Sequence, residues 1–211
     1  MKLSDRPLLL EELKSKLKGN LPNKEAMAMM FPNLASMPII VPDDAKPSAV
    51  MILLFHKNEE WHIIAIRRTE DGHAHSGQIS FPGGKKEQAD ENLLITALRE
   101  TYEEIGIRQE NIEYIGSLSS VYISVSNFNV YPYIGFLKNI NELNISTDEV
   151  QEVLEIKLSE LLSPHAKITT EVKSPIQPKL TRVVNAYKPR EDVIIWGATA
   201  LMIAELELIL R

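Results

Sequence analysis

The sequence predicts an α/β or α+β fold built on a mixed sheet. Strand-like runs dominate the middle of the chain, and the few helical patterns are interspersed among them rather than gathered at one end. A chain of 211 residues, with 44% hydrophobic and 25% charged side chains, also suits one globular domain with a sizeable core. We therefore expect a main domain over residues 49–211 and a short extension, residues 1–48, packed on it.

The extension should begin as a helix and continue as a loop. Residues 7–18 carry apolar side chains at helical spacing, namely Leu9, Leu10, Leu13 and Leu17. Residues 19–48 contain five of the twelve prolines, and proline favours turns. We expect this second part to be a loop-rich approach to the core.

The predicted sheet begins with a hairpin. Residues 49–56 and 61–68 are apolar and rich in β-branched side chains, and the polar residues 57–60 lie between them. Residues 69–80 follow as a polar loop, and Phe-Pro-Gly-Gly at residues 81–84 is typical of a sharp turn.

A helix is expected next, from residue 91 to residue 105, with Gly106 as its stop signal. At 100° per residue one stripe of this helix would face the sheet, made of Leu94, Ala97, Leu98, Thr101 and Ile105. Further strands are expected at residues 112–118, 121–124, 128–137, 150–156 and 181–187. One or two helical turns are expected over residues 158–162, and a leucine-rich helix over residues 198–210.

Composition excludes several classes of function. The chain has no cysteine, which rules out disulfides, thiolate zinc sites and cysteine nucleophiles. A formal net charge of -6 argues against nucleic-acid or membrane partners, because both need a basic surface. No stretch reaches the length of a membrane span, and the start lacks the apolar centre of a signal peptide. The default expectation is a cytoplasmic enzyme.

The expected helix carries a cluster of acids beside its apolar stripe. Glu100, Glu103 and Glu104 fall on one face, where like charges four residues apart cost roughly 0.2–0.5 kcal/mol per pair. A cation among them would remove that repulsion, and hard divalent cations such as Mg²⁺ prefer oxygen ligands of this kind. Arg99 can pair with Glu103 and orient the cluster. The alternative interpretation is a helix face that is simply acidic and solvated.

Arg99-Glu100-Thr101-Tyr102-Glu103-Glu104-Ile105-Gly106, preceded by Gly83-Gly84, resembles the Nudix box. The gap from Gly84 to Arg99 is one residue longer than the usual pattern, and Asp90 or Glu91 stands for its early glutamate. The resemblance implies a Nudix-type α/β/α sandwich with a loop-helix-loop catalytic motif. It also implies hydrolysis of a diphosphate linkage with Mg²⁺ or Mn²⁺.

Longer segments resemble the coenzyme A pyrophosphatase subfamily. They are residues 77–84, which read GQISFPGG, Arg68-Thr69 upstream, residues 149–153 and residues 195–200. The resemblance implies cleavage of coenzyme A or a derivative to a phosphopantetheine fragment and an adenosine bisphosphate. One departure is His73, which stands where that subfamily usually has arginine, so a contact to substrate phosphate would be weaker.

The resemblance also assigns roles to residues. Glu100, Glu103 and Glu104 would hold the metal, with the carbonyl of Gly83 as a further ligand, and Glu103 would take part in catalysis. Glu149 and Glu152 are alternative general bases. Supporting residues would be Gly84, Asp90, Glu91 and Arg99. Gln78, in the segment that resembles the subfamily, would contact the substrate. From their position, Arg67 and Arg68 end a strand and precede the polar loop, so one of them could reach a substrate phosphate while the other faces solvent. His73 and His75 lie on that loop, where they could contact phosphates or be exposed structural residues. Residues 121–130 could shape the pocket for the pantetheine or acyl arm.

Other functions remain open at this stage. A Nudix enzyme could act on ADP-ribose, nucleotide sugars or nucleoside triphosphates instead. A ligand-binding module without catalysis is a different class, although all three glutamates are kept here. A structural protein with a solvated acidic helix is the third alternative. Trp61, Trp196 and the final helix are interpreted as core or as contacts of a homodimer.

Overall fold

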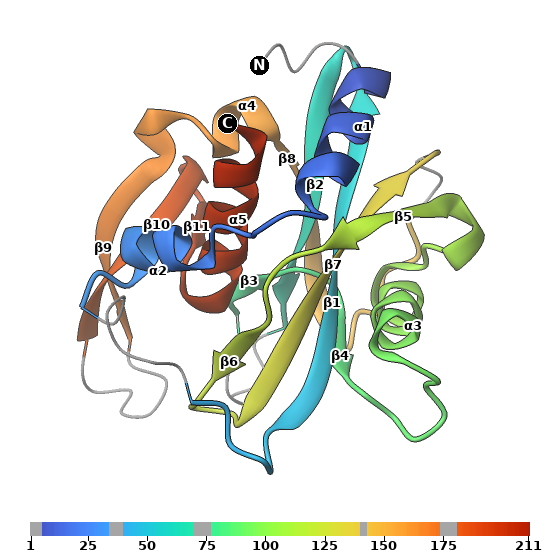
Figure 1. Ribbon diagram of the computed structural model, residues 1–211, viewed down its shortest axis with the longest axis horizontal. Helices are drawn as coiled ribbons and strands as arrows, with labels where there is room; N and C mark the ends of the chain where they lie inside the picture. The colour runs from blue at the N-terminus through green and yellow to red at the C-terminus, as the bar shows by residue number, and fades with distance from the viewer. Residues whose placement is uncertain (1–5, 34–39, 70–76, 140–142, 174–180) are drawn as a thin grey trace.

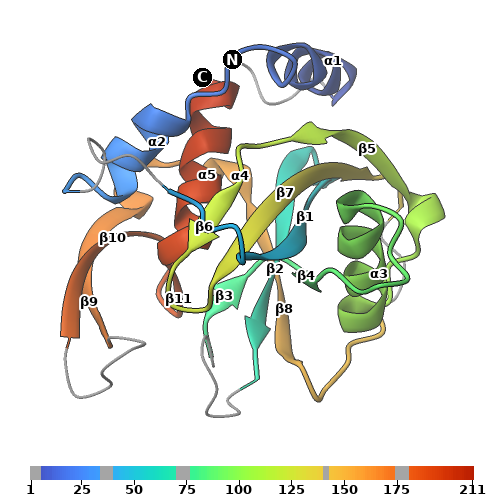
Figure 2. The same ribbon diagram turned by 60° about the horizontal axis from the view of Figure 1, so that its bottom comes forward.

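The computed structural model describes residues 6–33, 40–69, 77–139, 143–173 and 181–211. Its centre is a mixed sheet with helices on both faces, as Figure 1 and Figure 2 show. Helix α3 (Leu93–Ile105) covers one face, whereas α5 (Gly197–Leu210) and α2 (Asn23–Met30) lie on the other side. The predicted fold class, with its mixed central sheet, is confirmed.

The sheet is organised around one long hairpin. Strands β1 (Lys46–Lys57) and β2 (Glu60–Arg68) are antiparallel, and the last pair of their register is Lys57 with Glu60. Asn58 and Glu59 close the turn with φ of 53° and 63°, the left-handed pair that a two-residue hairpin requires.

The remaining strands extend this hairpin on both sides. Strand β1 also pairs in parallel with β7 (Phe128–Leu137), which makes the sheet mixed. Five further strands complete it: β3 (Ile79–Ser80) and β8 (Val150–Lys157) on β2, β4 (Gly83–Lys85) on β1, and β5 (Ile112–Ser117) and β6 (Val121–Ile123) on β7.

Side chains of β1 alternate between two hydrophobic cores. Ile52 and Leu54 pack in the core that contains α5, while Leu53 and Phe55 pack in the core that contains α3. Successive residues of a strand point to opposite faces, so a strand buried on both faces is apolar throughout. This explains why residues 49–56 show no alternation of apolar and polar residues.

A second sheet lies beyond α5. It has three antiparallel strands, in the order β11 (Val193–Ile195), β10 (Thr181–Arg190), β9 (Lys167–Lys173). Buried Tyr187 of β10 donates a hydrogen bond from its hydroxyl to Glu207 of α5 at 2.8 Å. The short elements α4 (Leu158–Leu161), η1 (Gln109–Asn111) and η2 (Pro164–Ala166) connect the strands, and α1 (Arg6–Lys16) begins the described chain.

Five strands and helices differ from the sequence-based expectations. Strand β3 lies at the end of residues 69–80, which were expected to be a loop, because it pairs with β2. Helix α2 lies inside the segment expected to be loop-rich, and it forms there because Ala26, Met27 and Met30 are buried against the core that contains α5. Residues 83–85 are strand β4 rather than part of a bare turn. Strands β9 and β11 were not predicted at all. Within the described residues, no helix is long and apolar enough to cross a membrane.

Candidate functional site

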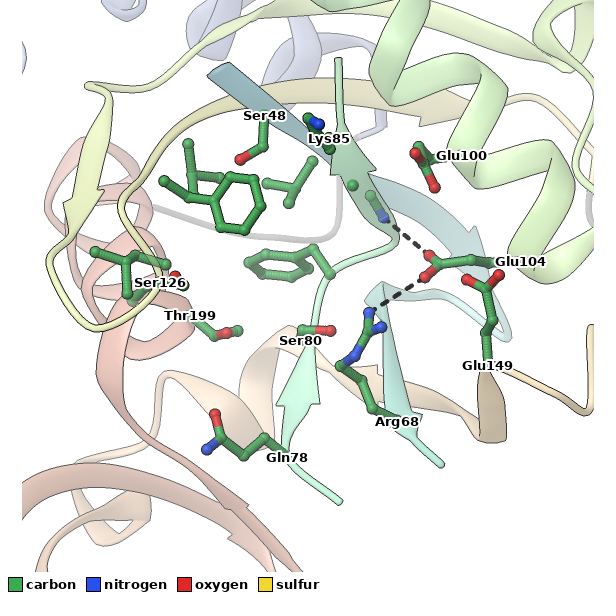
Figure 3. A pocket seen from close by; sticks show the side chains of 18 of the residues that line it. Ser48, Arg68, Gln78, Ser80, Lys85, Glu100, Glu104, Ser126, Glu149 and Thr199 are labelled. Carbon is green, nitrogen blue, oxygen red and sulfur yellow. Dashed lines mark hydrogen bonds and ion pairs between the residues drawn. The ribbon is translucent and has the colours of Figure 1, made fainter. Parts of the chain in front are cut away.

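A cavity of about 510 Å³ lies between the acidic face of α3, the start of β4 and the first turn of α5. Figure 3 shows Glu100, Glu104 and Glu149 at one end of it and Ser126 and Thr199 at the other. Its lining includes acids, cations, hydroxyls and aromatic rings, among them Arg68, Gln78, Ser80, Gly83, Gly84, Lys85, Arg99, Glu100, Glu103, Glu104, Ile123, Ser126, Phe128, Val130, Glu149, Trp196, Ala198, Thr199 and Met202.

Helix α3 is fixed at both ends, which sets the position of its acids. Asn92 caps the N-terminus by accepting a hydrogen bond from the backbone N–H of Ile95 at 3.1 Å. Gly106 ends the helix with φ of 76°, the left-handed conformation that glycine adopts at low cost. The apolar stripe packs toward the sheet as predicted, with Ala97, Thr101 and Ile105 buried.

Glu104 is the most buried acid of the cavity, with only 1% of its side chain exposed. It accepts a hydrogen bond from the backbone N–H of Gly83 at 2.9 Å, and Arg68 donates to its other oxygen at 3.4 Å. The pKa of Glu104 is raised to about 8, chiefly by burial and also by the carboxylates of Glu100 and Glu149, against the opposing effects of Gly83 and Arg68. The positive charge that the protein places beside Glu104 therefore does not offset the cost of ionising this carboxyl group in its buried position.

Glu100 lies beside the glycine pair that precedes the helix. A side chain on Gly84 would place its Cβ 2.5 Å from Oε1 of Glu100, so only glycine lets this carboxylate rest against the backbone. Burial raises the pKa of Glu100, and its carboxylate neighbours Glu103 and Glu149 raise it as well, while Arg99 lowers it.

Gly83 is required for a different reason. Its φ is 153°, and an added Cβ would lie 2.3 Å from the backbone oxygen of Ala49. The absence of a side chain lets β4 approach β1 closely enough for the N–H of Gly83 to reach Glu104. The sharp backbone path at the two glycines is therefore part of the acid site.

Arg99 holds the acid cluster together from the side. It donates to both oxygens of Asp90 at 3.0 and 3.1 Å, to Glu103 at 2.8 Å and to the carbonyl of Lys85 at 3.1 Å. The Arg99 guanidinium is the main cause that keeps the pKa of buried Asp90 well below its ordinary range. Of the two candidates for the early acid of the box, Asp90 makes these contacts and Glu91 is exposed.

Two pairs of sequence candidates are separated by the strand geometry. Arg67 and Arg68 are consecutive on β2, so they point to opposite faces. Arg68 lines the cavity, whereas Arg67 pairs with Glu152 at 3.2 Å and with the carbonyl of Asp192. Glu149 lines the cavity from the turn just before β8, and Glu152, within β8, does not line it. The structure thus brings Arg68 and Glu149 to the glutamates and leaves Arg67 and Glu152 outside the cavity lining.

The other sequence candidates are placed as follows. Gln78 lines the cavity, while His73 and His75 lie outside the described residues. Trp196, which we interpreted as core or as a dimer contact, lines the cavity together with Thr199. Lys85 also lines it, although the sequence did not single it out. The sequence could have indicated Trp196 as a site residue, because it lies in residues 195–200, the C-terminal segment that resembles the coenzyme A pyrophosphatase subfamily.

The residues present fit a hard divalent cation. Within the described ranges no three Asp, Glu or His side chains form a complete metal-binding cluster as they stand. The donors at the acidic end are nevertheless all oxygens, and Glu100 and Glu104 are carboxylates whose pKa is raised by burial beside one another. A divalent cation would supply the missing charge, and Mg²⁺ or Mn²⁺ matches this donor set.

The chain matches a family model. The model of the NUDIX domain covers residues 45–177, which is more than half of the chain. The matched region contains the hairpin, the two glycines, α3 and both candidate bases.

Relatives from distant organisms are similar to this chain. One is an uncharacterized Nudix hydrolase, NudL, of Pectobacterium atrosepticum, 33% identical over 146 residues that cover 69% of this chain and 73% of the relative. Another is Nudix hydrolase 3 of Caenorhabditis elegans, 34% identical over 149 residues that cover 66% of this chain. The match spans 62% of the nematode protein, which is less than two thirds of its length.

A solved structure supports the fold. A MutT/nudix family protein from Enterococcus faecalis superposes with a TM-score of 0.51 at 18% identity, covering 89% of this chain and 73% of that one. At this level of identity the likeness concerns the arrangement of helices and strands alone.

Proposed function

Because this chain belongs to the Nudix hydrolase family, we propose that it cleaves the diphosphate linkage of coenzyme A or its derivatives. The products would be a phosphopantetheine fragment and adenosine 3',5'-bisphosphate. Nudix hydrolases act on pyrophosphate bonds and generally use divalent metal ions, so the substrate is the specific part of this proposal.

The proposal depends on the different side chains that line the two ends of the cavity. One end is lined by Glu100, Glu103, Glu104 and Glu149, and the other by apolar and hydroxyl side chains. A substrate that fits both ends has a charged diphosphate joined to a long, mostly apolar arm. Coenzyme A has this form, and the segments at residues 77–84 and 195–200 that resemble its pyrophosphatases both contribute to the lining.

The acidic end would hold the metal. Glu100, Glu103 and Glu104 are the proposed ligands, with the carbonyl of Gly83 as a further one. When bound, a divalent cation neutralises charge on the diphosphate and acidifies the attacking water. The contribution of the chain is to fix the carboxylates, through the N–H of Gly83 on Glu104 and through Arg99 on Glu103.

Glu149 is the proposed general base. It lines the cavity and lies near Glu104, while Glu152 pairs with Arg67 and is absent from the lining. Replacing Glu149 with glutamine should lower kcat by roughly 10²–10⁴-fold, the usual contribution of a positioned base. Glu152→Gln is the matched control, because it changes the same residue type three positions further along, within β8, and should leave kcat unaltered.

Lys85 is the proposed contact for a substrate phosphate. Three cations line the cavity in the described part of the chain, and two of them are already paired, Arg68 with Glu104 and Arg99 with Asp90. Lys85 forms no ion pair with described residues and is exposed to solvent. Its ammonium group is therefore available to an anionic substrate without breaking an internal contact.

The test is a substrate panel followed by mass spectrometry. Coenzyme A, acetyl-coenzyme A, ADP-ribose, NADH, a nucleotide sugar and nucleoside triphosphates would be incubated with the protein and Mg²⁺ or Mn²⁺. We expect coenzyme A species to be cleaved with the highest kcat/KM, and Glu104→Gln to abolish this cleavage. Preference for another diphosphate would contradict the substrate while keeping the hydrolase. No metal-dependent cleavage of any compound would favour a binding module.

A further inference from the structure

Two hydroxyl groups of the cavity lack hydrogen-bond partners. The side-chain oxygens of Ser80 and Ser126 are buried and have no partner among the described residues. Both residues line the cavity. A buried hydroxyl without a partner destabilises a folded protein, so native structures rarely contain one without a reason. A ligand that fills this cavity and displaces its solvent would have to supply the partners of these two groups.

Ser126 lies far from the acidic end. Figure 3 shows it with Thr199 on one side of the cavity, Glu104 and Glu149 on the other side, and Ser80 between them. A phosphate bound at the glutamates would therefore leave Ser126 to a different part of the substrate.

The turn that carries Ser126 is fixed by its own contacts. The backbone N–H of Ser126 donates to the carbonyl of Ile123 at 3.3 Å, and the next residue, Asn127, has φ of 55°. Tyr122 donates from its hydroxyl to Asn127 at 2.9 Å, and Asn127 donates to Asp44 at 3.2 Å. These bonds fix the backbone that carries the Ser126 side chain before any ligand arrives, which lowers the entropy that binding must overcome.

The surrounding wall is uncharged. Figure 3 shows Ser126 and Thr199 at this end, and the cavity-lining residues that neighbour them on the β6–β7 segment and around the start of α5 are Ile123, Phe128, Val130, Trp196, Ala198 and Met202. An anionic group placed here would lose its hydration and find no cation among these lining residues, since the one cation recorded beside them in the described part of the chain, Lys46, lies with its ammonium 5.8 Å from the centre of the Phe128 ring. A sugar would bring several hydroxyls that need partners. An apolar chain with isolated amide groups matches the wall, because each amide needs only one or two hydrogen bonds.

We propose that this end of the cavity is a subsite for an apolar arm that carries amide groups, and that Ser126 is its specificity-determining hydrogen-bond partner. The subsite rests on the proposed function, since it assigns residues to the arm of the same substrate. Ser126 donates its hydroxyl proton to an amide carbonyl of the arm, and the ring of Phe128 packs against the methylene groups. Substrates without such an arm leave the hydroxyl unpaired and gain nothing from this end.

The test compares Ser126→Ala with Ser124→Ala, which removes an exposed hydroxyl from the start of the same turn. Coenzyme A hydrolysis is measured by kcat and KM, and pantetheine, the arm without the diphosphate, is added as an inhibitor. Ser126→Ala should raise KM for coenzyme A and the inhibition constant of pantetheine together, by about 3- to 10-fold, the value of one hydrogen bond. Ser124→Ala should leave both constants unchanged.

A second variant tests whether the arm occupies the space beside Ser126, rather than whether it forms a hydrogen bond with the Ser126 hydroxyl. Ser126→Leu should fill the subsite and abolish pantetheine inhibition, and thermal unfolding shows whether it remains folded. Unaltered constants in Ser126→Ala and inhibition retained by folded Ser126→Leu would overturn the subsite, even if wild type cleaves coenzyme A. Failure of wild type to cleave coenzyme A would instead overturn the proposed function. The two failures are therefore distinguishable.

Discussion

The substitution Glu104→Gln should stabilise the protein in the absence of divalent metal. Glu104 is almost completely buried, and burial is the largest cause that raises its pKa from 4.5 to about 8. The folded protein therefore holds the ionised form of this side chain at a cost. Glutamine has the same shape, keeps one oxygen for the N–H of Gly83 and carries no charge.

The magnitude follows from the two pKa values. They differ by about 3.5 pH units, and each unit corresponds to about 1.4 kcal/mol, so the full cost of ionisation is about 5 kcal/mol. That shift already includes the favourable effect of Arg68, but in the variant the buried amide N–H group faces the guanidinium without an acceptor, which costs about 2 kcal/mol. We expect a net increase of about 2–3 kcal/mol in the free energy of unfolding at pH 8.

The pH dependence has a definite sign. The pKa of Glu104 is higher in the folded protein than in the unfolded chain, so the folded protein binds this proton more tightly. The contribution of this difference to the free energy of unfolding is fully present below pH 4.5 and is lost as the pH rises toward 8. Glutamine does not titrate, so the advantage of the variant should grow across this range. At 2–4 °C per kcal/mol for a chain of this size, the melting temperature should rise by roughly 4–12 °C at pH 8.

The assay is thermal unfolding with a chelator at pH 5 and pH 8, followed by titration with Mg²⁺. Glu103→Gln is the control, because Glu103 lies on the same helix but is 53% exposed, and it should give no comparable gain. Wild type should be stabilised by Mg²⁺ more than the Glu104 variant, because a ligand that binds the folded state stabilises it. A variant less stable than wild type at pH 8 with chelator would refute the reasoning.

Three further substitutions test other parts of the structure. Gly84→Ala should displace the carboxylate of Glu100, whose oxygen lies 2.5 Å from the added Cβ, and should lower kcat by at least about 10-fold. Lys85→Gln should raise KM for a diphosphate substrate by about 3- to 10-fold with kcat little changed, in steady-state kinetics. Tyr187→Phe should lower the free energy of unfolding by about 1 kcal/mol in urea titrations, because Glu207 loses a buried hydrogen bond.

A different result would contradict each of these three predictions. Full activity in Gly84→Ala would show that Glu100 can move without loss of function. Lys86, the next residue, does not line the cavity, so equal effects of Lys85→Gln and Lys86→Gln would point to general surface charge. A Tyr187→Phe protein as stable as wild type would mean that the contacts of Glu207 to Lys167 and Arg211 suffice.

The sequence predicted the elements whose pattern is local. Residues 128–137 and the helix ending at Gly106 coincide with β7 and α3, because strand runs and a glycine stop signal are read directly from neighbouring residues. Strands β9 and β11 were missed because their residues alternate weakly and are held by pairing with β10. Helix α2 was missed for a related reason, since its short segment is stabilised by packing rather than by its own propensity.

The sequence predicted the site residues best where they lie on a single helix. Spacing on one helix placed the three glutamates and Arg99 together, but it could not choose between Glu149 and Glu152, or between Arg67 and Arg68. That choice depends on which face of β2 and β8 each side chain occupies, and hence on strand register. Trp196 and Ser126 join the cavity only through the packing of α5 and the β6–β7 turn against it.

The central claim is that the acidic end of the cavity binds the metal, and Mn²⁺ binding tests it most directly. Free Mn²⁺ would be titrated with protein and followed by electron paramagnetic resonance, for wild type, Glu104→Gln and the distant control Glu152→Gln. The account predicts that wild type and the control bind Mn²⁺ equally, that Mg²⁺ displaces it, and that Glu104→Gln weakens binding by at least about 10-fold. Equal Mn²⁺ affinity in wild type and Glu104→Gln would contradict it.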